Sequence, residues 1–239
     1  MNEIITQHLF NFWEHIGKQA KFLYNHKDYK YTASKEESWP RKVFNINFLT
    51  LDYKELYDKM KNRGLPNSLA IAENNEKKKL LLDNHFRNTS EVKTMSLAST
   101  DIPKLTNDFS TITQVTTVDE ASVFTNVASQ SFGYTISVST IIPLLNDLKI
   151  RLYIGKYNNE FVSCGMIYLD DDGNSGIHMI GTLANYRGYG LGKTMTEKLL
   201  LETKVNKSNN VFLVASKAGE NIYLKMGFIT HGKLLSFAT

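Results

Sequence analysis

Residues 186–193 read YRGYGLGK, so three glycines alternate with larger side chains just before a run with helical spacing. Glycine adopts positive φ at little cost, which lets successive backbone N–H groups turn toward one point. A helix that begins directly after such a turn adds unpaired N–H groups and the positive end of its dipole. These residue types at this spacing predict a binding site for an anion such as a phosphate group.

The flanking sequence predicts the elements that position this turn. Residues 176–183 (GIHMIGTL) have strand character. Downstream, Leu191, Met195 and Leu199 recur at helical spacing on one face. The predicted order is strand, glycine turn, helix.

Two better-known glycine motifs fail on spacing. The dinucleotide fingerprint G-x-G-x-x-G needs a glycine where Lys193 stands. The P-loop G-x-x-x-x-G-K-[ST] needs a glycine where Arg187 stands, and the next apolar strand, 211–215, runs into Ser216 and Lys217 instead of a magnesium-binding acid. The spacing therefore disfavours both nucleotide-binding classes.

The pattern that does fit is [RQ]-x-x-G-x-[GA], filled by Arg187, Gly190 and Gly192. With these residues the chain resembles the GNAT superfamily of acetyl-CoA-dependent N-acetyltransferases. A second motif follows the predicted strand 211–215, because residues 223–228 (YLKMGF) resemble the Y-x-x-x-G-F signature that closes the same fold. The order and separation of the two motifs match the family.

The resemblance implies acetyl-CoA as co-substrate, with its pyrophosphate on the glycine turn. It also implies that the preceding strand splays from its neighbour, pairs with the pantetheine arm and offers an N–H to the thioester carbonyl. Tyr223 takes the position of the acid for the departing thiolate, although its ring could instead simply pack on the sheet. The implied cofactor-binding residues are Ile180, Gly181, Thr182, Leu183, Arg187, Gly188, Tyr189, Gly190, Leu191, Gly192, Lys193 and Ser216.

The general base stays open among three alternatives: His178, Glu160 and water. His178 has the pKa range suited to proton transfer near neutrality, but a lone histidine in an apolar run is often a core residue. Glu160 lies beside a predicted Asn158-Asn159 turn, where a solvated loop is the simpler interpretation. Cys164 lacks the neighbours of a nucleophile, so we expect a buried strand cysteine.

Composition excludes several other classes. The chain has 239 residues, 42% of them hydrophobic and 22% charged, which is typical of a globular protein that buries a core. The net charge of +4 is dispersed apart from the run 77–79, so we expect no nucleic-acid partner. Histidines and acids show no metal-ligand spacing, and a single cysteine excludes an internal disulfide. With no signal peptide or membrane span in the sequence, we expect a cytoplasmic protein without a membrane partner, and a homodimer remains open.

The element order predicts an α/β (α+β) chain with a GNAT domain at 109–239, which has a mixed, mostly antiparallel central sheet flanked by helices. A smaller α/β domain at 1–108 precedes it. The segment 121–146 carries no charged residue, so a strongly cationic acceptor must find its carboxylates elsewhere. Expected elements of the GNAT domain, beyond those given above, are a strand at 112–118, a helix capped by Asp119, a helix around 137–148, hairpin strands at 150–157 and 161–169, a short helix, and a final hairpin through Phe237.

The sequence of residues 1–108 predicts a helix followed by alternating strands and helices. Asn84-His85-Phe86 after a predicted helix faintly resembles the Gly-Phe closure, so this half could be a degenerate copy of the same fold that shapes the acceptor pocket. Its expected elements are an amphipathic helix through Ile5, Leu9, Phe12, Ile16 and Leu23, a strand with Phe44, Ile46 and Phe48 alternating, a helix at 52–63, a strand at 68–72, a helix at 76–82 and a strand at 92–97.

Two functions from different classes follow. The resemblance implies an enzyme that moves an acetyl group from acetyl-CoA to a primary amine of a small molecule, peptide or protein by direct attack on the thioester. The alternative is a non-catalytic module that binds acyl-CoA or a protein partner through the same fold. The set of Arg187, Gly190 and Gly192 together with Tyr223 favours the enzyme.

Overall fold

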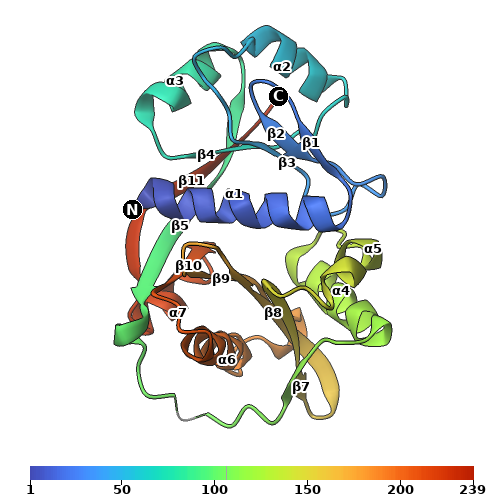
Figure 1. The fold of residues 1–239 in the computed structure, drawn as a ribbon, viewed down its shortest axis with the longest axis vertical. Coiled ribbons are helices and arrows are strands. Elements are labelled where there is room, and N and C mark those ends of the chain that lie inside the picture. The colour runs from blue at the N-terminus through green and yellow to red at the C-terminus, as the bar shows by residue number, and fades with distance from the viewer. Residues whose placement is uncertain (106) are drawn as a thin grey trace. The chain divides into compact units, whose positions relative to one another are not determined.

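The computed structural model describes residues 1–105 and 107–239, which form two compact units. Unit 1 comprises Met1–Met95, Val214–Glu220 and Thr230–Thr239, and unit 2 comprises Ser96–Leu213 and Asn221–Ile229. Each unit contains strands and helices, drawn in Figure 1. The predicted α/β fold class is confirmed.

The sheet of unit 2 has the strand order β10-β9-β8-β7-β6. The pairs from β6 to β9 are antiparallel, and β10 is parallel to β9, so the predicted mixed, mostly antiparallel sheet is confirmed. The strands are β6 (Ile112–Gln114), β7 (Ile150–Tyr157), β8 (Glu160–Leu169), β9 (Ser175–Thr182) and β10 (Asn210–Ala215), whose last residues belong to unit 1.

Helices α4 and α6 cover opposite faces of this sheet. A Cβ at Gly165 of β8 would meet Met195 and Leu199 of α6. Its neighbour Cys164 points the other way and lies by Gly181, where a Cβ would meet Ser131 of α4. The remaining elements are η1 (Ser99–Asp101), α4 (Val118–Phe132), α5 (Val138–Ile141), η2 (Ile142–Leu144), η3 (Ala184–Tyr186), α6 (Leu191–Val205) and α7 (Glu220–Lys225), which begins in unit 1.

The start of α4 corrects one prediction. The strand expected at 112–118 ends at Gln114, and Thr117 rather than Asp119 caps the helix. The Thr117 side chain accepts from the N–H of Glu120, whose carboxylate accepts from the N–H of Thr117. This capping box satisfies two N–H groups at once, whereas Asp119 lies within the first turn.

Two further predictions in this half are wrong. The helix expected around 137–148 is only the short α5 followed by η2, because Pro143 lacks an N–H and its ring clashes with the preceding turn. The final hairpin is one strand, β11 (Ile229–Ala238), with no turn in it. The predicted hairpin of β7 and β8 is confirmed, with Asn158 and Asn159 at φ 49° and 65°.

The sheet of unit 1 has the order β1-β2-β3-β4-β11-β5. Val43 packs with the side chains of α2 and α3, whereas the ring of its neighbour Phe44 lies against Phe10 and Trp13 of α1. The helices therefore cover both faces. The elements are α1 (Asn2–Gln19), β1 (Leu23–Asn25), β2 (Lys30–Thr32), β3 (Lys42–Phe44), α2 (Tyr53–Lys61), β4 (Leu69–Ala72), α3 (Asn75–Asp83) and β5 (Arg87–Ala98), whose last three residues belong to unit 2.

In unit 1 the predictions from the sequence agree with the structure better for helices than for strands. The helices expected at 52–63 and 76–82 are present as α2 and α3, but Leu23 lies in β1, beyond the end of α1. The alternation from Phe44 to Phe48 does not form a strand, because Asn45 takes φ 53° and ends β3. The short strands β1 and β2 were not predicted.

Candidate active site

The glycine turn has the backbone that an anion site requires. Gly188 and Gly190 have φ of 87° and 79°, and no described atom lies within 4 Å of a Cβ built on either. Glycine is therefore required at these two positions by the positive φ and not by close packing. Gly190 is the N-cap of α6 and has no side chain to cap the helix, and no acidic residue stands in its first turn. Thr194 donates its N–H to Gly190, which leaves the N–H groups before it without a helical acceptor.

Arg187 fixes the entry to this turn. Its Nε donates to the carbonyl of Thr182 at 3.2 Å, and its Nη2 donates to the carbonyl of Ser131 at 3.2 Å. The guanidinium thus joins the end of β9 to the last turn of α4. Because Arg187 is exposed, its remaining donors still face solvent.

An aromatic group supports the outer side of the turn. The ring of Tyr189 packs on Tyr157 with 5.2 Å between centroids, and Tyr157 also contacts Tyr186 at 6.1 Å. The Tyr186 hydroxyl donates to the carboxylate of Glu160, which raises the pKa of that phenol. Glu160 is therefore engaged with the turn, a contact that its place beside a hairpin did not reveal.

Strand β9 carries a bulge just before the turn. Cys164 pairs with Gly181 and Met166 pairs with His178, so β9 has one residue more than β8 between these pairs. Met179 sits in this bulge at φ 54°, a conformation that non-glycine residues adopt at some cost and that often marks functional sites.

Close packing explains Gly181 beside this bulge. A Cβ there would lie 2.9 Å from Cys164 Sγ and 2.9 Å from Ser131 Cβ. Cys164 is fully buried and donates to the carbonyl of Met179. The predicted burial of this strand cysteine is confirmed, and burial raises the pKa of its thiol to about 12.

The parallel ladder between β9 and β10 is short. It consists of the pairs Ser175–Val211 and Gly176–Phe212, and within the described residues it ends there. Beyond it, the edge of β9 from Ile177 to Thr182 turns backbone N–H and C=O groups toward the side where β10 no longer pairs.

Tyr223 lies on α7 and is linked to Thr196 in the second turn of α6. Its hydroxyl is hydrogen-bonded to Thr196, whose own hydroxyl donates to the carbonyl of Gly192 at 2.8 Å. Burial raises the pKa of Tyr223 to about 12, and the bond with Thr196 opposes this shift. The phenol therefore keeps its proton at neutral pH. Its ring also contacts Phe228 edge-on at 5.8 Å.

The other sequence-predicted residues fall in distinct places. Lys193 is mostly exposed and reaches Glu197 at 3.7 Å. Ser216 belongs to unit 1, where its carbonyl accepts from the N–H groups of Gly219 and Glu220. His178 is buried on β9. The choice of a general base stays a prediction.

Comparisons with known proteins identify the family of this domain. Residues 121–238 match the family model described as "Acetyltransferase (GNAT) domain". Among curated proteins, none matches this sequence. The chain carries a GNAT acetyltransferase domain, and through it belongs to the GNAT superfamily.

Solved structures of low sequence identity share the fold. A GCN5-related N-acetyltransferase from Kribbella flavida has a TM-score of 0.66 at 14% identity, covering 94% of this chain and 92% of its own. A GCN5-related N-acetyltransferase from Sphaerobacter thermophilus has a TM-score of 0.65 at 12% identity, covering 95% of this chain and 84% of its own. An acetyltransferase of the GNAT family from Colwellia psychrerythraea has a TM-score of 0.53 at 14% identity, covering 88% and 81%. At such low sequence identities the similarity shows a shared fold and nothing more.

The described residues contain neither a membrane-spanning helix nor a cluster of metal ligands. Among the described helices, none is long and apolar enough to cross a membrane. In the same part of the chain, no group of three or more histidine, cysteine, aspartate or glutamate side chains is placed to hold a metal ion.

Proposed function

We propose that this chain is an N-acetyltransferase that transfers the acetyl group of acetyl-CoA to a primary amine by direct attack on the thioester. The observation that carries the proposal is the uncapped start of α6, where Gly188 and Gly190 adopt positive φ beside the unpaired edge of β9. Backbone N–H groups and a helix dipole of about +0.5 charge favour a diphosphate at this point.

The residues fit the rest of such a co-substrate. The edge of β9 beyond Ile177 offers backbone groups to the amides of an extended arm, as a neighbouring strand would. The bulge at Met179 re-aims the following N–H groups, one of which can donate to a thioester carbonyl oxygen. Acetyl-CoA supplies the activated acyl group, and the chain supplies its orientation.

Tyr223 is the proposed hydrogen-bond donor to the departing sulfur. With a pKa of about 12 the phenol is protonated at neutral pH and can donate a hydrogen bond to a departing thiolate. Full proton transfer to a thiolate of ordinary basicity, with a pKa of about 8.5, would be uphill. Tyr223 therefore stabilises developing charge on sulfur more than it delivers a proton.

The test combines binding and turnover. Calorimetric titration with acetyl-CoA should show binding that weakens strongly in Arg187→Ala, because this change frees both carbonyls that hold the turn. Thiol release should then be followed across a panel of primary amines. We expect turnover in Tyr223→Phe to fall about tenfold or more with little change in acetyl-CoA affinity.

The matched control is Tyr157→Phe, which keeps the ring that supports Tyr189 and removes a hydroxyl outside the proposed chemistry. Binding without turnover on any amine would favour the non-catalytic acyl-CoA-binding module. No binding at millimolar acetyl-CoA would refute the role given to the glycine turn.

A further inference from the structure

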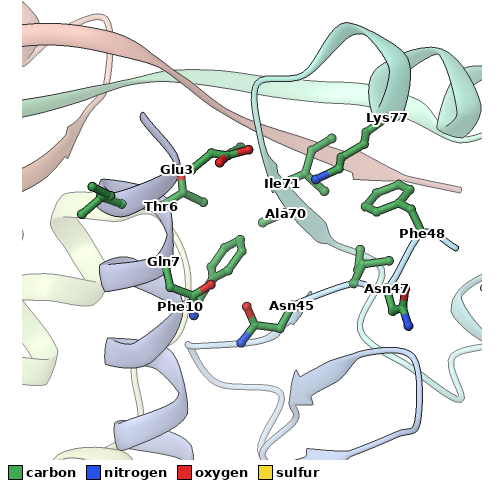
Figure 2. A pocket seen from close by; sticks show the side chains of 13 residues that line it. Glu3, Thr6, Gln7, Phe10, Asn45, Asn47, Phe48, Ala70, Ile71 and Lys77 are labelled. Carbon is green, nitrogen blue, oxygen red and sulfur yellow. The ribbon is translucent and has the colours of Figure 1, made fainter. Parts of the chain in front are cut away.

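A pocket of about 530 Å³ opens in unit 1 between α1, the residues after β3, strand β4 and the start of α3 (Figure 2). This volume lies within the range of about 300–1,000 Å³ that is usual for small-molecule sites. Phe10, Phe48 and Ile71 give it an apolar wall. The proposed acetyl transfer, which is assigned to unit 2, makes no use of this pocket.

One wall of the pocket is an unpaired strand edge. Strand β3 pairs with β4 only through Val43 and Leu69, and within the described residues the ladder ends there. The N–H of Glu73 donates to Lys233 on β11, so residues of odd number in β4 face β11. The carbonyl of Ala70 and the N–H of Ala72 therefore lie on the opposite edge of β4, where β3 no longer pairs with it. An extended ligand residue can pair with this acceptor and this donor as a strand would.

A buried hydroxyl on α1 lacks a partner in the same pocket. Thr6 is 2% exposed, and its Oγ1 has no hydrogen-bond partner among the described residues. Leaving such a group unsatisfied is unfavourable, and a ligand with a polar atom in reach removes the penalty. Asn45 lines the pocket at φ 53°, a left-handed conformation that asparagine tolerates and that ends β3 here.

The pocket lining carries one charge of each sign. Glu3 of α1 and Lys77 of α3 reach toward the same opening from opposite walls (Figure 2), and they form no ion pair with each other in the described part of the chain. The Lys77 ammonium lies 5.4 Å from the ring centroid of Phe48. A ligand with both an ammonium and a carboxylate would complement this lining.

The helix that joins β3 to β4 lies outside the pocket lining, and its start disfavours an anion. This helix, α2, is capped by Asp52, whose carboxylate accepts from the N–H of Glu55 at 2.9 Å. Two acidic side chains thus occupy the helix start that would otherwise attract an anion.

We propose that this pocket binds a short zwitterionic peptide in extended conformation. Its backbone pairs with Ala70 and Ala72, its ammonium faces Glu3, its carboxylate faces Lys77, and an apolar side chain contacts Phe10 and Phe48. A polar backbone atom of the peptide satisfies the hydroxyl of Thr6. This site is additional to the acetyl-CoA site and independent of it.

The experiment is calorimetric titration of the full chain with glycyl-L-phenylalanine. We expect saturable binding, and about tenfold weaker binding for N-acetyl-glycyl-L-phenylalanine amide, which lacks both charges. Lys77→Gln should weaken dipeptide binding about tenfold, and Thr6→Val, which keeps the shape of the side chain, about threefold or more. Lys79→Gln is the matched control on the same helix outside the lining, and it should bind as the unaltered chain does. Thermal melts of each variant report whether it folds.

Several outcomes would overturn the proposal. One is no heat of binding with millimolar dipeptide. Another is equal affinity in Lys77→Gln and Lys79→Gln. Binding of inorganic pyrophosphate that depends on Lys77, in place of the dipeptide, would make the pocket an anion site instead. Arg187→Ala separates the two sites, because it should weaken acetyl-CoA binding and leave dipeptide binding unchanged.

Discussion

Two places in this chain share one layout: a parallel strand pair that is joined by a helix and parts after a short ladder. In unit 2 the strands are β9 and β10 with α6 between them, and in unit 1 they are β3 and β4 with α2. The start of the joining helix differs, since Gly190 leaves α6 uncapped whereas Asp52 caps α2 with a carboxylate. We therefore expect the same layout to attract an anion in unit 2 and to disfavour one in unit 1.

The closing segments of the two units also correspond. In each, a residue of positive φ lies two positions past the end of a helix and is followed by a buried phenylalanine: Gly227-Phe228 after α7 and His85-Phe86 after α3. The N–H of each phenylalanine donates to the carbonyl five residues earlier at 3.0 Å. This likeness supports the hypothesis that unit 1 is a degenerate copy of the fold, which remains a hypothesis.

The largest expected effect comes from giving the glycine turn the chemistry of the other unit. Gly190→Asp places a carboxylate at the start of α6 and forces a side chain into φ 79°, so we expect acetyl-CoA affinity to fall about 100-fold or more. Gly190→Asn is the matched control, because asparagine tolerates this φ without a charge and should lose far less. Equal losses in calorimetry would show that charge at the helix start is unimportant.

Close packing at β9 should give the next largest effect. Gly181→Ala brings a Cβ within 2.9 Å of two side-chain atoms, so we expect about 1–3 kcal/mol of destabilisation in urea unfolding. At Gly188 a Cβ would meet no atom, so only the positive φ disfavours alanine. We expect Gly188→Ala to lower the free energy of unfolding by about 1 kcal/mol. The reverse order would mean that α4 does not press on β9 as described.

Alkaline pH should weaken the folded chain through buried acids of unit 2. The pKa of Cys164 rises from 9.0 to about 12 on folding, so the folded state keeps a proton that the unfolded state releases. Stability therefore falls as pH rises from about 9 toward 12. Thermal melts between pH 8 and 11 should show a shallower decline of Tm for Cys164→Ala than for the unaltered chain. Parallel declines would contradict the burial of this thiol.

The smallest effect concerns the two helix ends. His85→Gly removes a side chain from φ 69° and makes the end of α3 like that of α7, so we expect a gain of about 0.5–1 kcal/mol. Chemical unfolding would measure it. Destabilisation by this change would mean that the His85 ring, which contacts Tyr57 edge-on at 6.3 Å, contributes more than its backbone strain removes.

Local patterns allowed much of unit 2 to be predicted from the sequence. The glycine turn, the helix after it and the Asn158-Asn159 hairpin each depend on residues close in sequence, and all are present. Contacts between distant residues were missed. The hydrogen bonds of Tyr223 with Thr196 and of Arg187 with Ser131 join segments that lie close together only in the folded chain.

Strand pairing in unit 1 was hidden for the same reason. β11 was expected to form a hairpin, but it pairs with β4, from Leu234 opposite Ala72 to Phe237 opposite Leu69. Apolar alternation indicates a strand without naming its partner, and three-residue strands such as β1 and β2 carry too few residues for a pattern.

The most direct test of the central claim follows backbone N–H resonances of isotopically labelled protein during titration with acetyl-CoA. We expect the resonances of Gly188, Gly190, Leu191, Gly192 and Lys193 to shift and their hydrogen exchange to slow, while those of residues 52–55 at the start of α2 stay unchanged. Saturable binding that leaves the glycine turn unmoved, or that shifts the start of α2 instead, would contradict the account.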